Sequence, residues 1–497
     1  MEVEIIKTSS SAHDSPRYGK HYTAEEVADL FAPSKSTTNA IYEWLVSFGI
    51  PREYHVPPHI QEHVDYISPG IKLHTPGRGR AGSANLGKRI FGVTSAKGNI
   101  MYNITPPVLA APGNKMGIFE DLGDVYSQAD LNSFYAKYAT NIPKGTAPTL
   151  NAIDGAVAPV AVTAAGAESN LDFQIAWPII YPQGTVLYQT DDPVYENNYV
   201  FSGFLNTFLD ALDGSYCSTV DPLDPKYPDT SSKAGAYKGA LQCGVYKPTN
   251  VISISYGGDE AGLPVAYQRR QCNEFMKLGL QGVSILVASG DSGVAGSQCL
   301  GSTATCPYIT AVGGTYLPAG ANVAIDAEVA VTRFPSGGGF SNIYAIPSYQ
   351  SSAVASYLKN YPPTYKSYQT VNSTNVGANS GIYNSAGRAY PDVSAVGDNV
   401  VIFTGGSEGL IGGTSASSPA FGAILNRINE ERIAAGKSTI GFVNPTLYAH
   451  PGVLHDIVKG TNAGCGTKGF SASPGWDPVT GLGTPNYPAM LSLFMSL

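Results

Sequence analysis

Short apolar runs alternate with amphipathic segments over most of the chain. Three runs contain few polar residues and close on glycine or carboxylate residues, namely 115–121 (KMGIFED), 250–257 (NVISISYG) and 282–291 (GVSILVASGD). Runs of this kind are typical of strands buried in a parallel sheet. Helical patterns separate them, at residues 127–139, 197–213, 264–280 and 418–436. The alternation predicts an α/β fold, a doubly wound parallel sheet with helices on both faces, in one large domain.

The first 99 residues do not continue this pattern. Residues 1–74 are polar and rich in histidine and proline, with helical pieces at 23–31 and 36–50. Thr23 and Glu26 have the spacing of a capping box at the start of the first piece. Residues 75–99 are rich in glycine, serine and basic residues without apolar periodicity, which indicates a linker. We therefore expect a cleavable hinge between an N-terminal segment and a domain spanning residues 100–497.

Charge is scarce along the 497 residues. Charged residues make up 14% of the chain, against roughly 25% in typical soluble domains, and the net charge is −8. Few titrating groups mean little self-repulsion at low pH, which suits an extracellular protein. Because no basic stripe and no apolar run of membrane-spanning length occur, we expect neither nucleic-acid nor membrane partners, and we expect a monomer.

The cysteines also favour an oxidising compartment. Six are present, all in the C-terminal part, and none forms a C-x-x-C pair: Cys217, Cys243, Cys272, Cys299, Cys306 and Cys465. An even number fits disulfides, but six cysteines allow 15 pairings. Asn103 and Asn372 are glycosylation acceptors if the chain is secreted. The first residues, MEVEIIKTSS, do not have the pattern of a signal peptide.

The stretch GGTSASSPAFGAI, residues 412–424, places Ser415 in a glycine turn at the start of a helical segment. A helix N-terminus offers free N–H groups and a positive dipole end, which favours a nucleophile whose substrate develops negative charge. A serine nucleophile needs a base, and no histidine lies between residues 75 and 449. Unless His450 or His455 serves, the base is another residue type.

Carboxylates are the alternative. Glu168 and Asp172 are four residues apart on an otherwise apolar helical segment, so they share a helix face. Two close carboxyl groups can share a proton, one acting as base while the other orients it. Asp291 follows a buried strand, where catalytic groups of open α/β sheets lie. Taken singly, a solvated acidic turn and a turn aspartate explain these residues equally well.

Together these motifs resemble a known family. GGTSASSP (412–419), ESNLD (168–172), SGDSG (289–293) and GWDPVTGLGTPN (475–486) are similar to motifs of the sedolisins, the serine-carboxyl peptidases. SYGGDE, AVGGT, SGGGFSN and GRAYPDVSA match in the same order. The resemblance covers roughly residues 115–497, implies a subtilisin-like fold, and is strongest to the fungal secreted tripeptidyl-peptidases.

The resemblance implies roles for individual residues. Ser415 would be the nucleophile, Glu168 the general base, Asp172 its orienting partner, and Asp291 a protonated donor to the oxyanion. Glu168 must then be ionised while Asp291 is protonated, which implies operation in acid. The expected substrate-binding residues are Ser255, Tyr256, Gly257, Ser336, Gly337 and Gly338.

A calcium ion and a propeptide are also implied. The carboxylates of Asp456 and Asp477 and the carbonyls of Ile457, Ser473 and Gly475 would form an oxygen shell for one Ca²⁺. Residues 1–74 resemble a propeptide of the family in pieces, with its middle part absent. The implied activity is release of tripeptides from free N-termini of polypeptides, through an acyl-enzyme on Ser415.

Other interpretations remain open at this point. An endopeptidase of the same family fits equally well, and an inactive homologue or carbohydrate-binding protein would follow if the missing segments abolish activity. The sequence HIQEH also fits the H-x-x-E-H pattern of zinc peptidases, with His59 and His63 as ligands, although two prolines precede it directly.

Overall fold

The computed structural model describes residues 10–32, 34–47, 101–107, 109–197, 204–218, 221–296, 302, 304–323 and 326–497. Its centre is a sheet in which the described strands follow the order β12-β6-β5-β4-β1-β3-β2, with every neighbouring pair parallel. These strands are β1 (Met116–Glu120), β2 (Thr149–Ala152), β3 (Thr185–Gln189), β4 (Val251–Ile254), β5 (Ser284–Ala288), β6 (Thr310–Tyr316) and β12 (Val393–Val396). The short β7 (Val329–Ala330) pairs antiparallel with β6.

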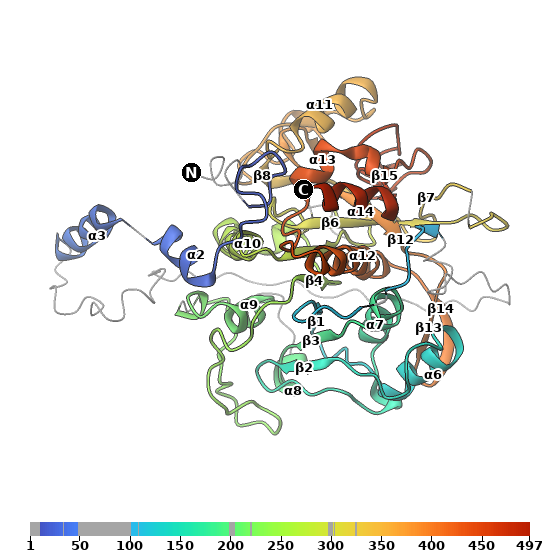
Figure 1. The fold of residues 1–497 in the computed structure, drawn as a ribbon. Helices are drawn as coiled ribbons and strands as arrows, with labels where there is room; N and C mark the ends of the chain where they lie inside the picture. The colour runs from blue at the N-terminus through green and yellow to red at the C-terminus, as the bar shows by residue number, and fades with distance from the viewer. Residues whose placement is uncertain are drawn as a thin grey trace.

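The central strands are buried on both faces because successive side chains enter two different cores. On β1, Ile118 packs into a cluster with Phe173 and Phe421, whereas Phe119 packs into a second cluster with Phe208 and others. The first face is covered by α7 (Ala167–Ile180) and α12 (Thr414–Ala434), the second by α9 (Asn206–Leu212) and α10 (Val265–Leu280) (Figure 1). The predicted doubly wound sheet with helices on both faces is confirmed.

Helix α12 is the central helix of the molecule. Almost all of its residues from Thr414 to Arg432 are buried, and its apolar positions are not confined to one stripe. A helix of this kind is stable only inside a large core. Its N-terminus is set by Gly413, and its start places Ser415 in the first turn.

Smaller elements surround this centre. The further helices are α6 (Gln128–Tyr138), α8 (Pro193–Asn197), α11 (Ser351–Asn360), α13 (Asn444–Ala449) and α14 (Tyr487–Ser496), with 3-10 turns at 162–164, 216–218, 260–262, 378–380 and 451–453. The further strands pair as β8 (Gly339–Ala345) with β11 (Gly387–Tyr390), β9 (Ser367–Tyr368) with β10 (Tyr383–Asn384), β13 (Val400–Thr404) with β14 (Ser407–Ile411), and β15 (Leu454–His455) with β16 (Thr484–Pro485). In the described part of the chain, no helix is long and apolar enough to cross a membrane.

Disulfides brace the second face of the sheet. Cys217 pairs with Cys243, and Cys272 of α10 pairs with Cys306. Cys465 is also disulfide-bonded, and Cys299 lies outside the described residues. The expectation of disulfides is confirmed.

The N-terminal segment docks on the catalytic body through α2 (Ala24–Phe31). The capping box is present, because Thr23 and Glu26 exchange side-chain hydrogen bonds with each other's backbone N–H groups. Val27 is 2% exposed and, with α9 and α10, lines a pocket at their junction. Helix α3 (Lys35–Ser47) has no buried residue and lies away from the body in Figure 1. The predicted linker 75–99 and the histidines of HIQEH lie outside the described residues.

Candidate active site

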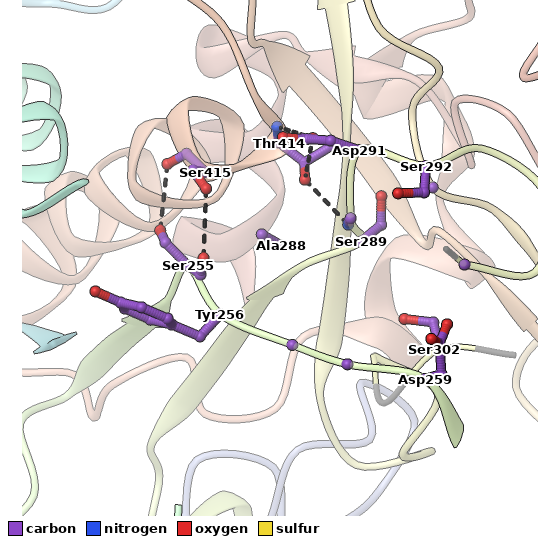
Figure 2. A pocket seen from close by; sticks show the side chains of 15 residues that line it. Ser255, Tyr256, Asp259, Ala288, Ser289, Asp291, Ser292, Ser302, Thr414 and Ser415 are labelled. Atoms are coloured by element: carbon purple, nitrogen blue, oxygen red, sulfur yellow. Dashed lines mark hydrogen bonds between the residues drawn. The ribbon is translucent and has the colours of Figure 1, made fainter. Parts of the chain in front are cut away.

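Four segments bring polar side chains together beyond the carboxyl ends of the central strands. Ser255 follows β4, Asp291 follows β5, Ser415 begins α12, and Glu168 and Asp172 lie on α7. Adjacent parallel strands end at one edge of the sheet, which is where α/β sheets hold their ligands. Figure 2 shows Ser255, Asp291 and Ser415 around one pocket. The structure therefore brings together the four residues predicted to carry the chemistry.

Ser415 is half-buried and lines this pocket. Its Oγ lies 3.3 Å from the carbonyl oxygen of Ser255, and its hydroxyl is near enough to the Glu168 carboxyl to lower the pKa of that group against the effect of burial. No histidine lines the pocket among the described residues. The ring of His450 packs against His13, with centroids 4.9 Å apart, and His455 belongs to β15. Glu168 is thus the base within reach of the Ser415 hydroxyl.

Glu168 and Asp172 form a carboxyl pair with little access to water. Burial raises the pKa of both groups, and the charge on Glu168 raises that of Asp172 further. Hydrogen bonds from Ser415 and Ser255 oppose the rise at Glu168. One oxygen of each group, Oε1 of Glu168 and Oδ1 of Asp172, has no hydrogen-bond partner in the described structure. The pair can therefore hold one proton, with Asp172 retaining it more firmly because its neighbour repels its charge.

Ser255 connects the pair to the nucleophile. Its Oγ lies 2.9 Å from Oδ2 of Asp172 and 3.2 Å from the carbonyl oxygen of Ser415. The sequence predicted Ser255 as a substrate-binding residue. In the structure Ser255 lines the pocket with Tyr256 and Gly257, and its hydroxyl bonds Asp172.

Asp291 lies across the pocket from this pair. Its Oδ1 accepts from the backbone N–H of Thr414 at 2.7 Å and from Thr414 Oγ1 at 3.0 Å (Figure 2). A Cβ added to Gly413 would lie 2.8 Å from Oδ2, so glycine at that position keeps the carboxyl beside the start of α12. Loss of hydration raises the pKa of Asp291, and the Thr414 hydrogen bonds oppose that rise. A protonated carboxyl beside a helix N-terminus can donate to an oxyanion formed at Ser415.

Two further carboxylates belong to this neighbourhood and were missed from the sequence. Asp124 accepts from the backbone N–H groups of Ser169 at 2.9 Å and Glu168 at 3.3 Å, and so caps the start of α7. Glu120 is fully buried and accepts from the hydroxyl of Tyr256 at 2.7 Å. Burial raises the pKa of Glu120, followed by the charge of Asp172. For Glu120 the signal was present, because IFED ends a buried strand as ASGD does.

The predicted substrate-binding residues are only partly brought to the pocket. Gly337 lines it together with the segment from Ser255 to Gly257. Ser336 is fully buried and accepts from the backbone N–H of Gly314, while Gly338 packs against the carbonyl of Pro478. The positions of Ser336 and Gly338 do not bring them to this pocket, because the glycine loop turns into the fold on either side of Gly337.

The five expected calcium ligands form one loop cluster away from this pocket. Oδ2 of Asp456 accepts from the backbone N–H of Gly475 at 2.8 Å, and Oδ2 of Asp477 accepts from that of Ser473 at 2.9 Å. Thr480 links the carbonyl of Ile457 to Oδ1 of Asp477, each 3.3 Å from its hydroxyl. Among the described residues, no group of three or more His, Cys, Asp or Glu could hold a metal, so carbonyl oxygens would have to complete the shell. That donor set, two carboxylates and carbonyls, fits a hard cation such as Ca²⁺.

Comparison with known proteins agrees with this arrangement. Residues 6–54 match the activation domain of pro-kumamolisin. The chain is 53% identical to tripeptidyl-peptidase sed1 of Aspergillus fumigatus over 571 aligned residues, covering 97% of the chain and 88% of the relative. It is 45% identical to aorsin of Aspergillus oryzae over 610 residues, covering all of the chain and 92% of the relative. The solved Pseudomonas sedolisin, a serine-carboxyl proteinase, shares the fold with a TM-score of 0.58 at 21% identity, over 82% of this chain and 99% of that one. The chain thus belongs to the sedolisin family of serine-carboxyl peptidases.

Proposed function

We propose that this chain hydrolyses peptide bonds in acid through an acyl-enzyme on Ser415, with a carboxylate in the place that histidine takes in other serine peptidases. The observation that carries this proposal is the nearness of the Ser415 hydroxyl to the Glu168 carboxyl, whose pKa it lowers against the effect of burial, beside a pocket whose described lining contains no histidine. A serine hydroxyl becomes an effective nucleophile only when an adjacent group can take its proton.

Each step can be assigned to a group of this chain. Ser415 Oγ attacks the carbonyl carbon of the scissile bond while Glu168 takes the hydroxyl proton. The oxyanion accepts hydrogen bonds from the Asp291 carboxyl and the backbone N–H of Ser415. Glu168 returns the proton to the leaving amine, and the acyl-enzyme ester is then hydrolysed by a water that Glu168 deprotonates. Asp172 keeps its proton and orients Glu168 throughout.

The protonation states require acid. Glu168 must be ionised and Asp291 must be protonated in the same molecule. The raised pKa of Asp291 extends its protonated range upwards, whereas hydrogen bonds from Ser415 and Ser255 help Glu168 to ionise against its burial. Burial nevertheless raises the pKa of Glu168 to about 8, so the proposed acid range requires the substrate-bound site to favour the ionised Glu168 more strongly. Activity would fall on both sides of the range in which the two states coexist.

The proposed substrate is a polypeptide with a free N-terminus, from which a tripeptide is released. Support comes from tripeptidyl-peptidases that are similar to this chain along its length, including sed1 of Aspergillus fumigatus and tripeptidyl-peptidase 1 of Homo sapiens, the latter 28% identical over 99% of this chain. We also propose secretion and glycosylation, because the described cysteines are disulfide-bonded and both acceptors, Asn103 and Asn372, are exposed.

We further propose that one Ca²⁺ binds the loop cluster of Asp456, Ile457, Ser473, Gly475 and Asp477. The ion would tie the segment around residue 456 to the turn at residues 473–480. Its contribution would be structural, because this cluster does not line the pocket of Ser415.

Peptide digestion at pH 3–6, read by mass spectrometry, tests the proposed function. A peptide with a free amino group should lose successive tripeptides, and the same peptide with a blocked amino group should resist. Ser415→Ala should abolish turnover, since loss of a covalent nucleophile costs on the order of 10⁴ to 10⁶ in kcat. Internal cleavage of both peptides would indicate an endopeptidase, and near-normal turnover by the variant would exclude this mechanism.

A further inference from the structure

The hairpin of β13 and β14 leads directly into the nucleophile. Strand β14 ends at Ile411, and two glycines separate it from helix α12, whose second residue is Ser415. Both glycines of the hairpin turn, residues 405–406, have a left-handed φ, as the tightest hairpin turns require. Figure 1 shows the two strands side by side, next to α6 and α7. The hairpin therefore connects the nucleophile with the surface of the molecule.

The inner edge of the hairpin is occupied by a side chain of α7. The backbone N–H of Phe403 donates to Oε1 of Gln174 at 2.7 Å, and its carbonyl accepts from Nε2 of the same residue at 2.8 Å. Phe403 thus directs its backbone groups away from β14, and Glu408, its partner across the hairpin, directs its own groups to the opposite side. Because this orientation alternates along an antiparallel pair, Leu410 also presents its N–H and carbonyl at the outer edge.

The outer edge of β14 is open. Residues 407–410 are all exposed, and the apolar Leu410 has an exposed fraction of 45%. In the part of the chain that the structure describes, β14 pairs with β13 alone, and no hydrogen bond reaches the backbone of Glu408 or Leu410. A Cβ added at Gly409 would meet no atom within 4 Å. An unpaired edge of this kind is a template for pairing with another extended chain.

The hairpin lies on the side of Ser415 where the leaving amine departs. Ile411 packs against the small core cluster that contains Leu171 of α7 and Ala416 of α12. Leu171 follows Glu168 by about one helical turn. Glu168 must reach the leaving nitrogen in order to return its proton. The described lining of the pocket beyond β4 and β5 includes neither Glu168 nor any residue of β14, so the hairpin is a separate surface.

The direction of the two chains decides how a substrate pairs with this edge. The leaving peptide begins at the nucleophile with its new amino group and runs outward, whereas β14 runs inward and ends near Ser415. The two chains are therefore antiparallel, which is the slightly more stable pairing. Leu410 precedes Ser415 by five residues, and five residues of extended chain span at most about 18 Å. A leaving peptide of about five residues thus reaches Leu410, and one of about seven residues reaches Glu408.

We propose that the outer edge of β14 binds the part of the polypeptide substrate after the scissile bond as an added antiparallel strand. This inference rests on the proposed function, because it takes Ser415 as the nucleophile and Glu168 as the group that protonates the leaving amine. Main-chain hydrogen bonds supply the affinity, so the edge accepts any extended sequence without proline at the paired positions. Long polypeptides are then cleaved in preference to peptides with one residue after the scissile bond.

Peptides of increasing length test this inference. Each has a free amino group and the same N-terminal tripeptide, followed by one, three, five, seven or nine residues of mixed alanine and serine. The initial release of the tripeptide gives kcat/KM, and the ratio for nine residues over one is the length gain. Each main-chain hydrogen bond should contribute about two- to tenfold, so the gain should rise to about seven residues and then level off. A ratio near one, with the shortest peptide cleaved, would overturn the inference and uphold the proposed function.

Methylated peptides distinguish strand pairing from side-chain contacts. In an antiparallel pair, only every second residue directs its N–H to a given neighbouring strand. N-methylation at alternate residues of the leaving peptide should therefore reduce the length gain, and N-methylation at the residues between them should not. Losses that do not alternate would contradict pairing with β14.

Two variants at one position complete the kinetic test. Leu410→Pro removes the outward N–H and suits an edge strand, because Gly409 before it has no Cβ to clash with the ring. This variant should reduce the length gain by about two- to tenfold. Leu410→Ala removes the side chain but keeps the N–H, so the gain should remain. A gain that is equal in the wild type and Leu410→Pro, or lost equally in both variants, would overturn the assignment of the β14 edge.

Hydrogen exchange covers a loss of turnover or of folding. In full-length Ser415→Ala, the longest peptide of the series should slow exchange at the outward amides of Glu408 and Leu410. The amide of Gly409, which pairs with Ile402 inside the hairpin, is the internal control and should not change. Unchanged exchange at both outward amides would overturn the inference even if the wild type cleaves no peptide. Protection of these amides without cleavage by the wild type would count against the proposed function alone.

Discussion

The hydroxyl of Ser255 lies 2.9 Å from Oδ2 of Asp172, while it also lies 3.2 Å from the carbonyl of Ser415. One side chain thus joins the helix that carries the carboxyl pair to the turn that carries the nucleophile. Its hydrogen bond favours the ionised form of the carboxyls, and it lowers the pKa of both Glu168 and Asp172 against the effect of burial.

Ser255→Ala should therefore move the acid limb of the pH–rate profile to higher pH. Without the hydroxyl, the pair ionises less readily, and a lost hydrogen bond to a charged group of about 1.5–3 kcal/mol corresponds to roughly one to two pH units. The measurement is kcat/KM against pH. Ser253→Ala is the matched control, because Ser253 is also buried and lies two residues earlier, on β4, but bonds Ser418. A limb that moves equally in both variants would show that Ser255 acts only through packing.

Asp291→Asn should change the alkaline limb of the pH–rate profile. The carboxamide can donate to the oxyanion but does not titrate, so the alkaline limb should move up or vanish, with a rate loss of about 10² if the donor is misplaced. The ionised carboxyl of Asp291 is one of the charges that raise the pKa of Glu168, so the acid limb should stay or move down, never up. A pH–rate profile of unchanged shape and height would show that Asp291 takes no part in the chemistry.

Removal of calcium should lower the melting temperature by several degrees. An ion that binds only the native state at 100 times its Kd stabilises it by about 2.7 kcal/mol. Elemental analysis of the purified chain should find one calcium, and Asp456→Asn should lose it while still folding, because Asp456 is exposed. An unchanged melting temperature after confirmed metal loss would contradict a stabilising ion, and zinc in the purified chain would favour the HIQEH interpretation instead.

The sequence predicted the strands and helices whose residues form an uninterrupted apolar run. Strands β1, β4 and β5 came from apolar runs, and α12 from a long apolar segment, although the helix begins at Thr414 rather than at residue 418. Strands β6 and β12 gave no such signal, and in β6 the pair Gly313 and Gly314 interrupts the apolar run. They form strands because each pairs with a neighbouring strand of the sheet. Glycine is required at position 313, since a Cβ there would lie 2.7 Å from Ser394 Oγ. Within the residues described, the predicted helix at 197–213 is helical at Asn197, where α8 ends, and from Asn206 to Leu212, after a left-handed Leu205.

The site was predictable in part for a related reason. Ser415 and Asp291 were found from their positions at a helix start and a strand end, which are local features. The contact between Glu168 and Ser415 depends on how α7 and α12 pack on the sheet, and spacing carries no information about that. Asp124 was missed because a helix cap supplied from another segment leaves no pattern at the helix itself.

His21 fixes the N-terminal segment to the catalytic body. Its Nε2 lies 2.8 Å from the carbonyl of Thr439, so this nitrogen carries the proton, and Nδ1 lies 3.0 Å from Ser10 Oγ. Arg432 of α12 is the charged group that faces it, beside Tyr18 and Ser438. Burial lowers the pKa of His21, and the charge of Arg432 lowers it further, against the hydrogen bond to Thr439.

Acid should therefore loosen this contact. The pKa of His21 in the docked segment lies below the free value of about 6.5. The docked state therefore has its full stability above that pH, and its stability decreases as the pH falls below it. A pKa difference of one changes the docking equilibrium about tenfold. In full-length Ser415→Ala, hydrogen exchange corrected for intrinsic rates should show protection of residues 10–32 falling between pH 7 and pH 5. His21→Gln should flatten that dependence, whereas Lys20→Gln, which removes an exposed positive charge from the neighbouring residue, should retain it. Equal pH dependence with and without His21 would show that other groups control the docking.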